Sequence, residues 1–180
     1  MSTALTFPLM TVEQCLELPE PQGPYRWELH FGELVKVGRP KIPHYNLQLL
    51  IPDLLRKKLS GRKWLIGMEM PYGLAPGYDV RAADVGVVLR KTWEACSKAD
   101  YMIGSPDIVI QIKSRSNRDR KMEEDAVLHI THCASAVWLV KPEQREVVVI
   151  TATSRQVYRP GQAIPLPGSA PLEVADIFPA

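Results

Sequence analysis

The stretch Ser105-Pro106-Asp107-Ile108-Val109-Ile110-Gln111-Ile112-Lys113 decides the fold, because it joins the strongest strand pattern of the chain to polar residues at its end. Side chains alternate between the two faces of a strand, so the three isoleucines share one face while Gln111 and Lys113 project together from the other. An amide oxygen and an ammonium at the end of an apolar strand suit the metal-assisted hydrolysis of a phosphodiester. A sheet-edge strand with a solvated polar face is the alternative interpretation.

The composition predicts one domain over residues 1–180. The chain has 180 residues, of which 46% are hydrophobic and 23% charged, and this is enough for a sizeable core. No apolar run approaches the roughly 18 residues that span a bilayer, and the first residues lack the pattern of a secretion signal. We therefore expect a cytoplasmic protein without a membrane partner. The three cysteines show neither a disulfide framework nor a zinc pattern, and the net charge of +2 permits a nucleic-acid partner without requiring one.

Helix and strand patterns alternate on both sides of this stretch. Before it, the apolar spacing predicts a helix over 11–18, a hairpin over 25–37 that turns near Phe31-Gly32, a helix over 46–59, and strands over 64–70 and 79–89. After it come a helix over about 119–133, strands over 136–141, 146–151 and 155–158, and a tail rich in Pro and Gly. This order predicts an α/β (α+β) chain in which helices flank a mixed β-sheet.

Several residues are candidates for a site, and each also has a simpler structural explanation. Asp84 stands directly before an apolar run, where a charge is costly to bury unless it is paired. Glu28 lies on the predicted hairpin, where most carboxylates face solvent. His129 and His132 are three apart on a predicted helix, but no carboxylate or cysteine completes a familiar metal spacing with them.

The most basic segment of the chain begins at the end of the central stretch. Five cations lie within residues 113–121. The candidates for contacts with nucleic-acid phosphates are Arg115, Arg118, Arg120 and Lys121. A charge run between a strand and a helix is, however, more often simply solvated.

Five motifs follow one another along the chain: Trp27-Glu28-Leu29-His30-Phe31-Gly32-Glu33, His44 before a helix, Arg81-Ala82-Ala83-Asp84, Pro106-Asp107-Ile108-Val109-Ile110-Gln111, and Trp138-Leu139-Val140-Lys141-Pro142. In the order and spacing of these motifs, the chain resembles the Uma-type family of restriction endonucleases in the PD-(D/E)XK nuclease superfamily. The resemblance covers nearly the whole chain. Ala83 stands where the family has proline, and Gln111 stands where it usually has glutamate. Many members take their lysine from the following helix, where this chain has Asp125. Lys113 instead occupies the ordinary lysine position of the superfamily.

The resemblance implies a restriction-endonuclease-like fold and metal-dependent hydrolysis of phosphodiester bonds, with DNA as the expected partner. It implies that Asp84, Gln111 and the backbone carbonyl of Ile112 bind Mg²⁺ or Mn²⁺, and that Lys113 acts on the attacking water or the developing charge. The further residues that would complete the site are Glu28, Glu69 and His44. Many such nucleases act as dimers, so a homodimer is one assembly that the resemblance allows.

Gln111 leaves a function of another class open. A neutral amide in place of the usual carboxylate fits a nuclease-like chain that has lost catalysis and serves as a nucleic-acid-binding or protein-interaction module. Under the catalytic interpretation, a shared metal requires Asp84 and the Gln111/Lys113 pair to lie on neighbouring strands and to converge at one end of the sheet.

Overall fold

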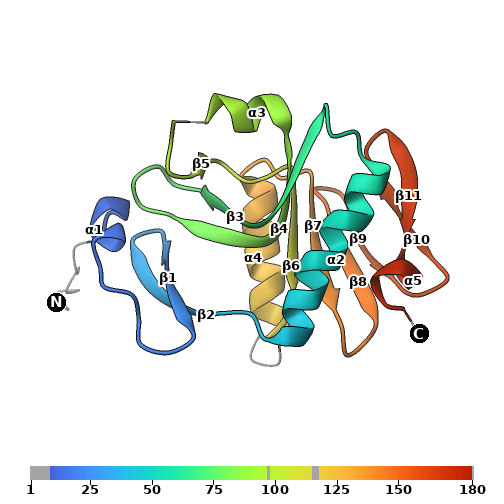
Figure 1. Cartoon of the computed structure of the whole chain (residues 1–180), viewed down its shortest axis with the longest axis horizontal. Coiled ribbons are helices and arrows are strands. Elements are labelled where there is room, and N and C mark those ends of the chain that lie inside the picture. The colour runs from blue at the N-terminus through green and yellow to red at the C-terminus, as the bar shows by residue number, and fades with distance from the viewer. Residues whose placement is uncertain (1–8, 97, 115–117, 180) are drawn as a thin grey trace, which may run out of the picture.

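The strand predicted from the central stretch, β6 (Ile108–Ile112), lies in the middle of a seven-stranded mixed sheet (Figure 1). The structure is a computed structural model that describes residues 9–96, 98–114 and 118–179. In spatial order, the sheet contains β5 (Met102–Ile103), β3 (Trp64–Gly73), β4 (Arg81–Leu89), β6, β7 (Ala136–Lys141), β8 (Glu146–Ile150) and β9 (Arg155–Tyr158). The pairs β3–β5 and β6–β7 are parallel, and the other neighbours are antiparallel.

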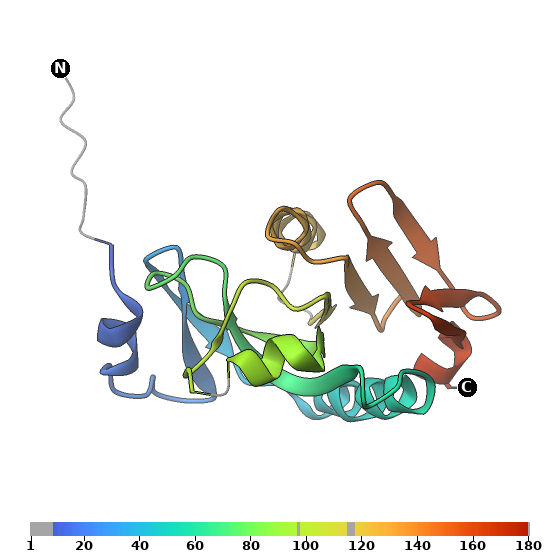
Figure 2. The same cartoon turned by 90° about the horizontal axis from the view of Figure 1, so that it is seen from above.

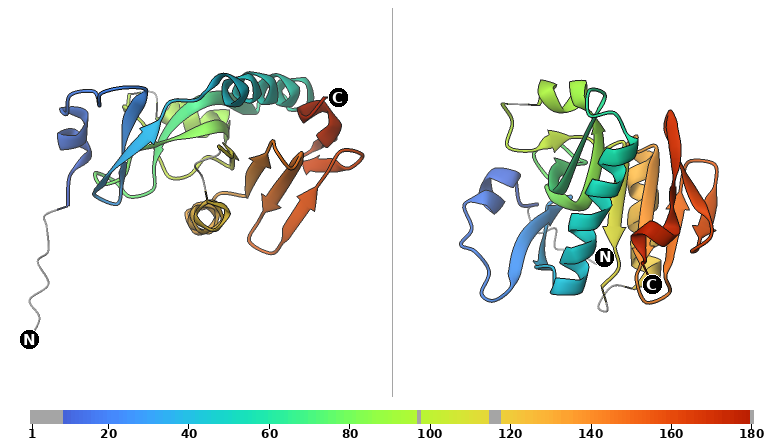
Figure 3. Two further views of the ribbon diagram at one scale, coloured as in Figure 1. Left: turned by 90° about the horizontal axis from the view of Figure 1, so that it is seen from below. Right: turned by 45° about the vertical axis from the view of Figure 1, so that its right-hand side comes forward.

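Helices cover both faces of this sheet, as the order of elements predicted. One face packs against α2 (Ile42–Lys58), α5 (Val174–Ile177) and the hairpin of β10 (Ala163–Leu166) and β11 (Ser169–Glu173). The opposite face packs against α4 (Asp119–Thr131), so that α2 and α4 lie on opposite sides of the sheet (Figure 2; Figure 3). The short helix α3 (Arg90–Ala95) follows β4 directly. No described helix is long and apolar enough to cross a bilayer.

Two core clusters confirm the predicted alternation of β6. Ile108, Ile110 and Ile112 are buried on the α2 side of the sheet, whereas Val109 is buried on the α4 side. With β4 and β7 paired on either side of it, β6 is not an edge strand, and the sheet-edge interpretation is wrong. Gln111 is the one residue of β6 that keeps partial exposure.

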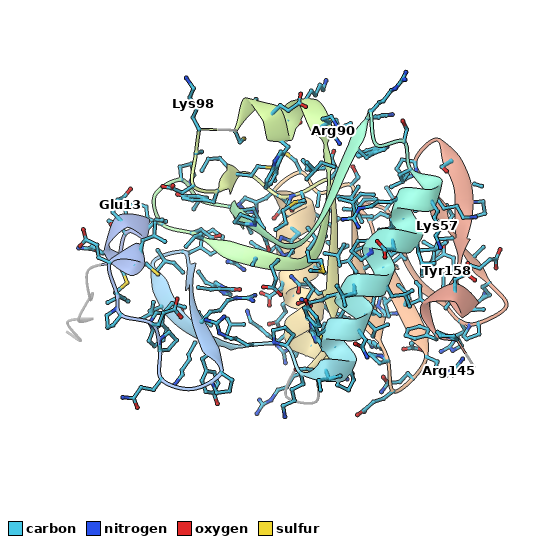
Figure 4. All side chains as sticks on the ribbon, viewed as in Figure 1. Glu13, Lys57, Arg90, Lys98, Arg145 and Tyr158 are labelled. Atoms are coloured by element: carbon cyan, nitrogen blue, oxygen red, sulfur yellow. The ribbon has the colours of Figure 1, made fainter. Side chains whose placement is uncertain are left out.

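The tail rich in Pro and Gly, for which the sequence predicted no helix or strand, adds structure to the α2 side. β10 and β11 pair across a turn in which Gly168 has φ +67°, and their Ile164 and Leu172 are fully buried. Arg145, labelled in Figure 4, donates to the carbonyl oxygens of residues 178 and 179, which ties the β7–β8 turn to the end of α5. The prolines of this segment masked the strand pattern, because proline is atypical of strand interiors.

A helix and a hairpin lie beside the sheet at the start of the described chain. α1 (Val12–Leu16) begins at the predicted cap, where Thr11 Oγ1 accepts the Gln14 N–H at 3.3 Å and Gln14 Oε1 accepts the Thr11 N–H at 2.9 Å. The hairpin of β1 (Tyr25–His30) and β2 (Glu33–Gly38) turns at residues 31–32, as predicted. Leu29 of β1 packs against the buried face of α1.

A buried ion pair fixes this hairpin to the sheet. Asp79 is fully buried, and its carboxylate accepts the backbone N–H of Phe31 at 3.1 Å and of Leu74 at 3.0 Å. The Arg81 guanidinium donates to the same carboxylate at 2.8–3.0 Å. Asp79 thus joins the tip of the hairpin to β3 and β4, and this holds the hairpin residues in a fixed position relative to the central strands.

Replacing Asp79 with Ala should lower the free energy of unfolding by about 3–5 kcal/mol, because the Arg81 guanidinium would stay buried without its partner. Urea unfolding followed by circular dichroism measures this loss. The matched control is Asp53→Ala, which removes an exposed pair with Arg56 and should cost less than about 1 kcal/mol. Equal losses in the two variants would contradict the anchoring role of Asp79.

Candidate active site

β4 and β6 separate at the end of their shared ladder, and Asp84 lies at this fork. The ladder ends with the pair Val85–Ile110, so that Asp84 and Gln111 are the next residues along the two strands. There the Ile112 N–H donates to Asp84 Oδ2 at 2.7 Å, in place of a bond to the backbone of β4. The expectation that Asp84 and Gln111 stand on neighbouring strands is confirmed.

Helix α2 brings two further side chains to Asp84. His44 Nε2 and Gln48 Nε2 both donate to Asp84 Oδ1, each at 3.0 Å. The spacing i, i+4 places His44 and Gln48 on one face of the helix. The helix reaches the site because it begins at Ile42, earlier than the apolar spacing predicted. Pro43 fits in the first turn, where its missing N–H has no helical partner to lose.

Glu69 reaches the same site from β3. Gln48 Nε2 donates to Glu69 Oε1 at 2.5 Å, so the carboxylates of Glu69 and Asp84 contact a single nitrogen. Glu69 has φ +46°, in the left-handed region that non-glycine residues seldom adopt, and it is left out of the β3–β4 register. Strain of this kind costs on the order of 1–3 kcal/mol and is typical of functional sites.

The hairpin contributes Glu28, which is buried between two basic partners. His30 Nε2 donates to Glu28 Oε2 at 2.8 Å, and Arg26 Nη2 donates to Glu28 Oε1 at 2.9 Å. Burial raises the pKa of Glu28, but the hydrogen bond from His30 and the charge of Arg26 outweigh burial and hold that pKa below its usual value. Glu28 is therefore ionised at neutral pH.

Lys113, the residue after β6, is paired with α4. Its Nζ donates to Asp119 Oδ1 at 2.9 Å, and Lys141 Nζ lies 3.2 Å from the same oxygen. The hydrogen bond from Lys113 is the largest influence on Asp119 and lowers the pKa of that carboxyl group. The structure therefore places the Lys113 ammonium beside the first turn of α4.

A cavity of about 920 Å³ joins these side chains. Its walls come from the β1–β2 hairpin, the start of α2, the fork of β4 and β6, and α4. Every residue predicted for catalysis or metal binding lines it: Asp84, Gln111, Ile112, Lys113, Glu28, Glu69 and His44. Their chemical roles stay a prediction, but residues far apart in the sequence do face one space.

The predicted nucleic-acid contacts lie on the surface near the start of α4. Three of them are exposed, namely Arg118, Arg120 and Lys121. Arg120 pairs with Glu124 at 2.8 Å and Lys121 pairs with Asp125 at 2.9 Å along the helix. Arg115 lies outside the described residues. Contact of these cations with phosphates stays a prediction.

The residue types around Asp84 fit a hard divalent cation. Across residues 9–96, 98–114 and 118–179, no three His, Cys, Asp or Glu side chains form a ready-made metal site. The carboxylates of Asp84 and Glu69 nevertheless present oxygen donors, which Mg²⁺ and Mn²⁺ prefer, while the Gln48 amide turns its nitrogen toward both of them. Gln48 Oε1 is buried without a hydrogen-bond partner in the described part of the chain. A buried acceptor without a partner costs about 1–3 kcal/mol. Because the amide nitrogen faces Asp84 and Glu69, this oxygen would coordinate a cation held between them only after the amide turned over.

Sequence reasoning missed two residues of this site. Gln48 shares the buried face of α2 with Ile51 and Leu55, and a glutamine among apolar residues at helical spacing is the signal that identifies it. Arg26 directly precedes the Trp27–Glu33 motif and also contacts Glu69. No spacing in the sequence relates Arg26 to that residue.

His129 and His132, considered as metal ligands from their spacing, have separate partners. His129 Nε2 contacts the Tyr72 hydroxyl at 3.2 Å inside the core, whereas His132 Nδ1 lies 2.8 Å from the carbonyl oxygen of Leu128. Burial, aided by the nearby charge of Arg81, lowers the pKa of His129 to about 4. His129 is therefore neutral at pH 7.

This mixed sheet with helices on both faces has the architecture expected of the restriction-endonuclease-like class of folds. The chain belongs to the Uma2 family, described as "Putative restriction endonuclease", whose family model matches residues 12–180. This confirms the resemblance seen in the sequence.

A solved structure shares the fold. A protein from Anabaena variabilis ATCC 29413, described as a putative nuclease belonging to DUF820, matches with a TM-score of 0.80 and 20% sequence identity. The match covers 94% of this chain and 97% of that one. Comparison with curated proteins finds no match.

The neutral state of His129 predicts a specific acid sensitivity. The unfolded chain binds a proton at this residue near pH 6.5 and the folded chain only near pH 4, so stability falls as the pH decreases through this range. The loss due to this residue is about 3 kcal/mol. His129→Gln, which keeps an acceptor for Tyr72, should remove that part of the difference in unfolding free energy between pH 7 and pH 4. Urea titrations at both pH values measure it, with His132→Gln as the control. An undiminished difference in His129→Gln would contradict this assignment.

Proposed function

We propose that this chain is a divalent-cation-dependent endonuclease that hydrolyses phosphodiester bonds of DNA, with Asp84 at the centre of its active site. The observation that carries the proposal is the position of Asp84. It lies at the fork of β4 and β6, accepts hydrogen bonds from β6 and α2, and shares a cavity with Glu69, Gln111 and Lys113. Membership of the Uma2 family and the likeness to a protein described as a nuclease support it.

The proposed cation is Mg²⁺ or Mn²⁺, held by oxygen atoms at the fork. Asp84 would be its main ligand, with the Gln111 amide oxygen and the Ile112 backbone carbonyl beside it, and Glu69 would add a second carboxylate. When bound, the cation would act as a Lewis acid that withdraws negative charge from the phosphate. Since His44 donates to Asp84 Oδ1, we assign His44 a positioning role in which it fixes the direction of that carboxylate.

Lys113 has the proposed role of handling charge at the reacting phosphate. Its ammonium lines the cavity and is paired with Asp119, which is half exposed. Asp119 keeps Lys141 as a partner at 3.2 Å, so it stays paired when Lys113 exchanges it for a phosphate oxygen or the attacking water. Stabilisation of the charge that develops in the transition state is then the contribution of Lys113 to turnover.

The proposed partner is DNA, and two further features belong to this proposal. The exposed cations Arg118, Arg120 and Lys121 follow Lys113 closely in the chain, and we propose that they contact phosphates that flank the cleaved bond. A homodimer, allowed by the family resemblance, would present two such sites to one duplex.

A nuclease-like module without catalysis is the second candidate function. Two observations favour it: Gln111 offers a neutral amide where a carboxylate is usual, and Lys113 is already paired with Asp119. Such a module would bind nucleic acid or a protein through the same cavity. Cleavage assays separate the two functions.

The wild-type chain should nick supercoiled plasmid DNA in the presence of Mg²⁺ or Mn²⁺, and EDTA should abolish the nicking. Asp84→Asn should cleave at least about 100-fold more slowly, because it removes the charge that holds the cation. Asp53→Asn, which changes an exposed carboxylate of α2, should cleave like the wild type. If the wild type cuts no nucleic acid with either ion, the module without catalysis takes the place of the endonuclease.

Gln111→Glu should lower the metal concentration that gives half-maximal cleavage. The variant keeps the length and the oxygen of the side chain and adds a negative charge beside the cation, so it should bind the metal more tightly. Parallel titrations of cleavage and of heat release with Mn²⁺ measure both effects. Lys113→Ala is the contrasting variant, because it should lose turnover while keeping metal affinity. A Gln111→Glu variant that binds Mn²⁺ no better than the wild type would remove Gln111 from the ligand set.

A further inference from the structure

Arg26 lines the cavity, and the proposed hydrolysis gives it no role. All three nitrogens of its guanidinium donate to carboxylates: Nε and Nη2 to Glu28 Oε1 at 3.2 and 2.9 Å, and Nη1 to Glu69 Oε2. The Arg26 side chain is 22% exposed, so its ion pairs are largely shielded from water. Arg26 therefore bridges a carboxylate of the hairpin to a carboxylate of β3.

The surroundings of Arg26 are strongly negative. Burial lowers its pKa, but the charges of Glu28, Glu69 and Asp84 outweigh burial and raise that pKa above its usual value. Each oxygen of Glu69 accepts one hydrogen bond, Oε1 from Gln48 and Oε2 from Arg26. Glu69 therefore has one neutral donor, the Gln48 amide at Oε1, and one charged donor, the Arg26 guanidinium at Oε2.

We infer that Arg26 is a resident counter-cation of the active site, which competes with a divalent cation for Glu69 and releases that carboxylate when the metal binds. This inference rests on the proposed function of Asp84 and Glu69 as metal ligands. Two cations that share one carboxylate in a partly buried site repel each other strongly. Arg26 keeps a partner after the exchange, because Glu28 accepts from two of its three guanidinium nitrogens.

The counter-cation role and a purely structural role predict opposite signs for metal affinity. If Arg26 only held the hairpin in place, its removal would loosen Glu28 and Glu69 and weaken metal binding. If Arg26 competes with the metal, its removal takes away a positive charge beside the ligands and strengthens metal binding. The sign of the change is therefore the decisive result.

The experiment is a calorimetric titration of the full-length chain with Mn²⁺. Arg26→Met, which keeps the length of the side chain without its charge, should bind Mn²⁺ about tenfold more tightly than the wild type. Arg26→Lys, which keeps one positive charge, should bind within about threefold of the wild type. An Arg26→Met variant that is folded by circular dichroism and binds Mn²⁺ equally or more weakly overturns the inference.

Asp84→Asn separates failure of this inference from failure of the proposed function. If Asp84→Asn abolishes Mn²⁺ binding while Arg26→Met leaves the affinity unchanged, the metal site stands and the counter-cation role fails. If Asp84→Asn binds Mn²⁺ like the wild type, the metal lies elsewhere, and both the proposed site and this inference are overturned.

A second measurement uses the wild-type chain and so does not depend on the folding of Arg26→Met. The arginine Nε–H resonances are followed by nuclear magnetic resonance during titration with Mg²⁺, and the resonance that is absent from Arg26→Lys identifies Arg26. This resonance should shift along the same Mg²⁺ saturation curve as the Ile112 amide, whose N–H donates to Asp84. An Ile112 amide that shifts while the Arg26 resonance stays in place overturns the inference.

Discussion

The Asp84 carboxylate is the constraint on which the site is built, because an acid with only 13% of its side chain exposed must be satisfied by hydrogen bonds. Its donors are the Ile112 N–H of β6 and the His44 and Gln48 side chains of α2. These bonds set the point at which β4 and β6 separate. They also hold the first turns of α2 against the sheet, so the same interactions shape the fold and direct the carboxylate into the cavity.

The negative charge of the carboxylates in the cavity is balanced by nearby donors. Asp84, Glu69 and Glu28 line it from three different strands, next to Asp125 of α4 and Glu143 of the β7–β8 turn, and the three strand carboxylates receive hydrogen bonds from Arg26 and from neutral donors. Gln111 adds an oxygen to the cavity without adding a further negative charge. A site of this composition attracts a cation less strongly than one with a further carboxylate, and Arg26 moderates that attraction further.

Lys113 and Lys121 are both paired with carboxylates of α4. Asp125, which the family resemblance aligns with a helix lysine of many members, pairs at 2.9 Å with Lys121, one turn earlier. Lys113 pairs with Asp119 at the start of the same helix. Both ammonium groups are thus paired with carboxylates of α4, and Lys113 also lines the cavity.

The sequence by itself determined the local structure: the alternation of β6, the capped helix α1, the hairpin turn at Phe31-Gly32 and the helix before β7. Motif order, through the family resemblance, also indicated Asp84, Gln111 and Lys113. Periodicity reports the face on which a side chain lies and says nothing of the strand that will pair beside it. The contacts of Gln48 with Asp84 and of Arg26 with Glu69 therefore depended on tertiary structure, since they arise only when α2 and the hairpin dock on the sheet. The structure of the tail also depended on tertiary contacts, because burial of Ile164 and Leu172 against α2 stabilises a hairpin that its prolines disfavour.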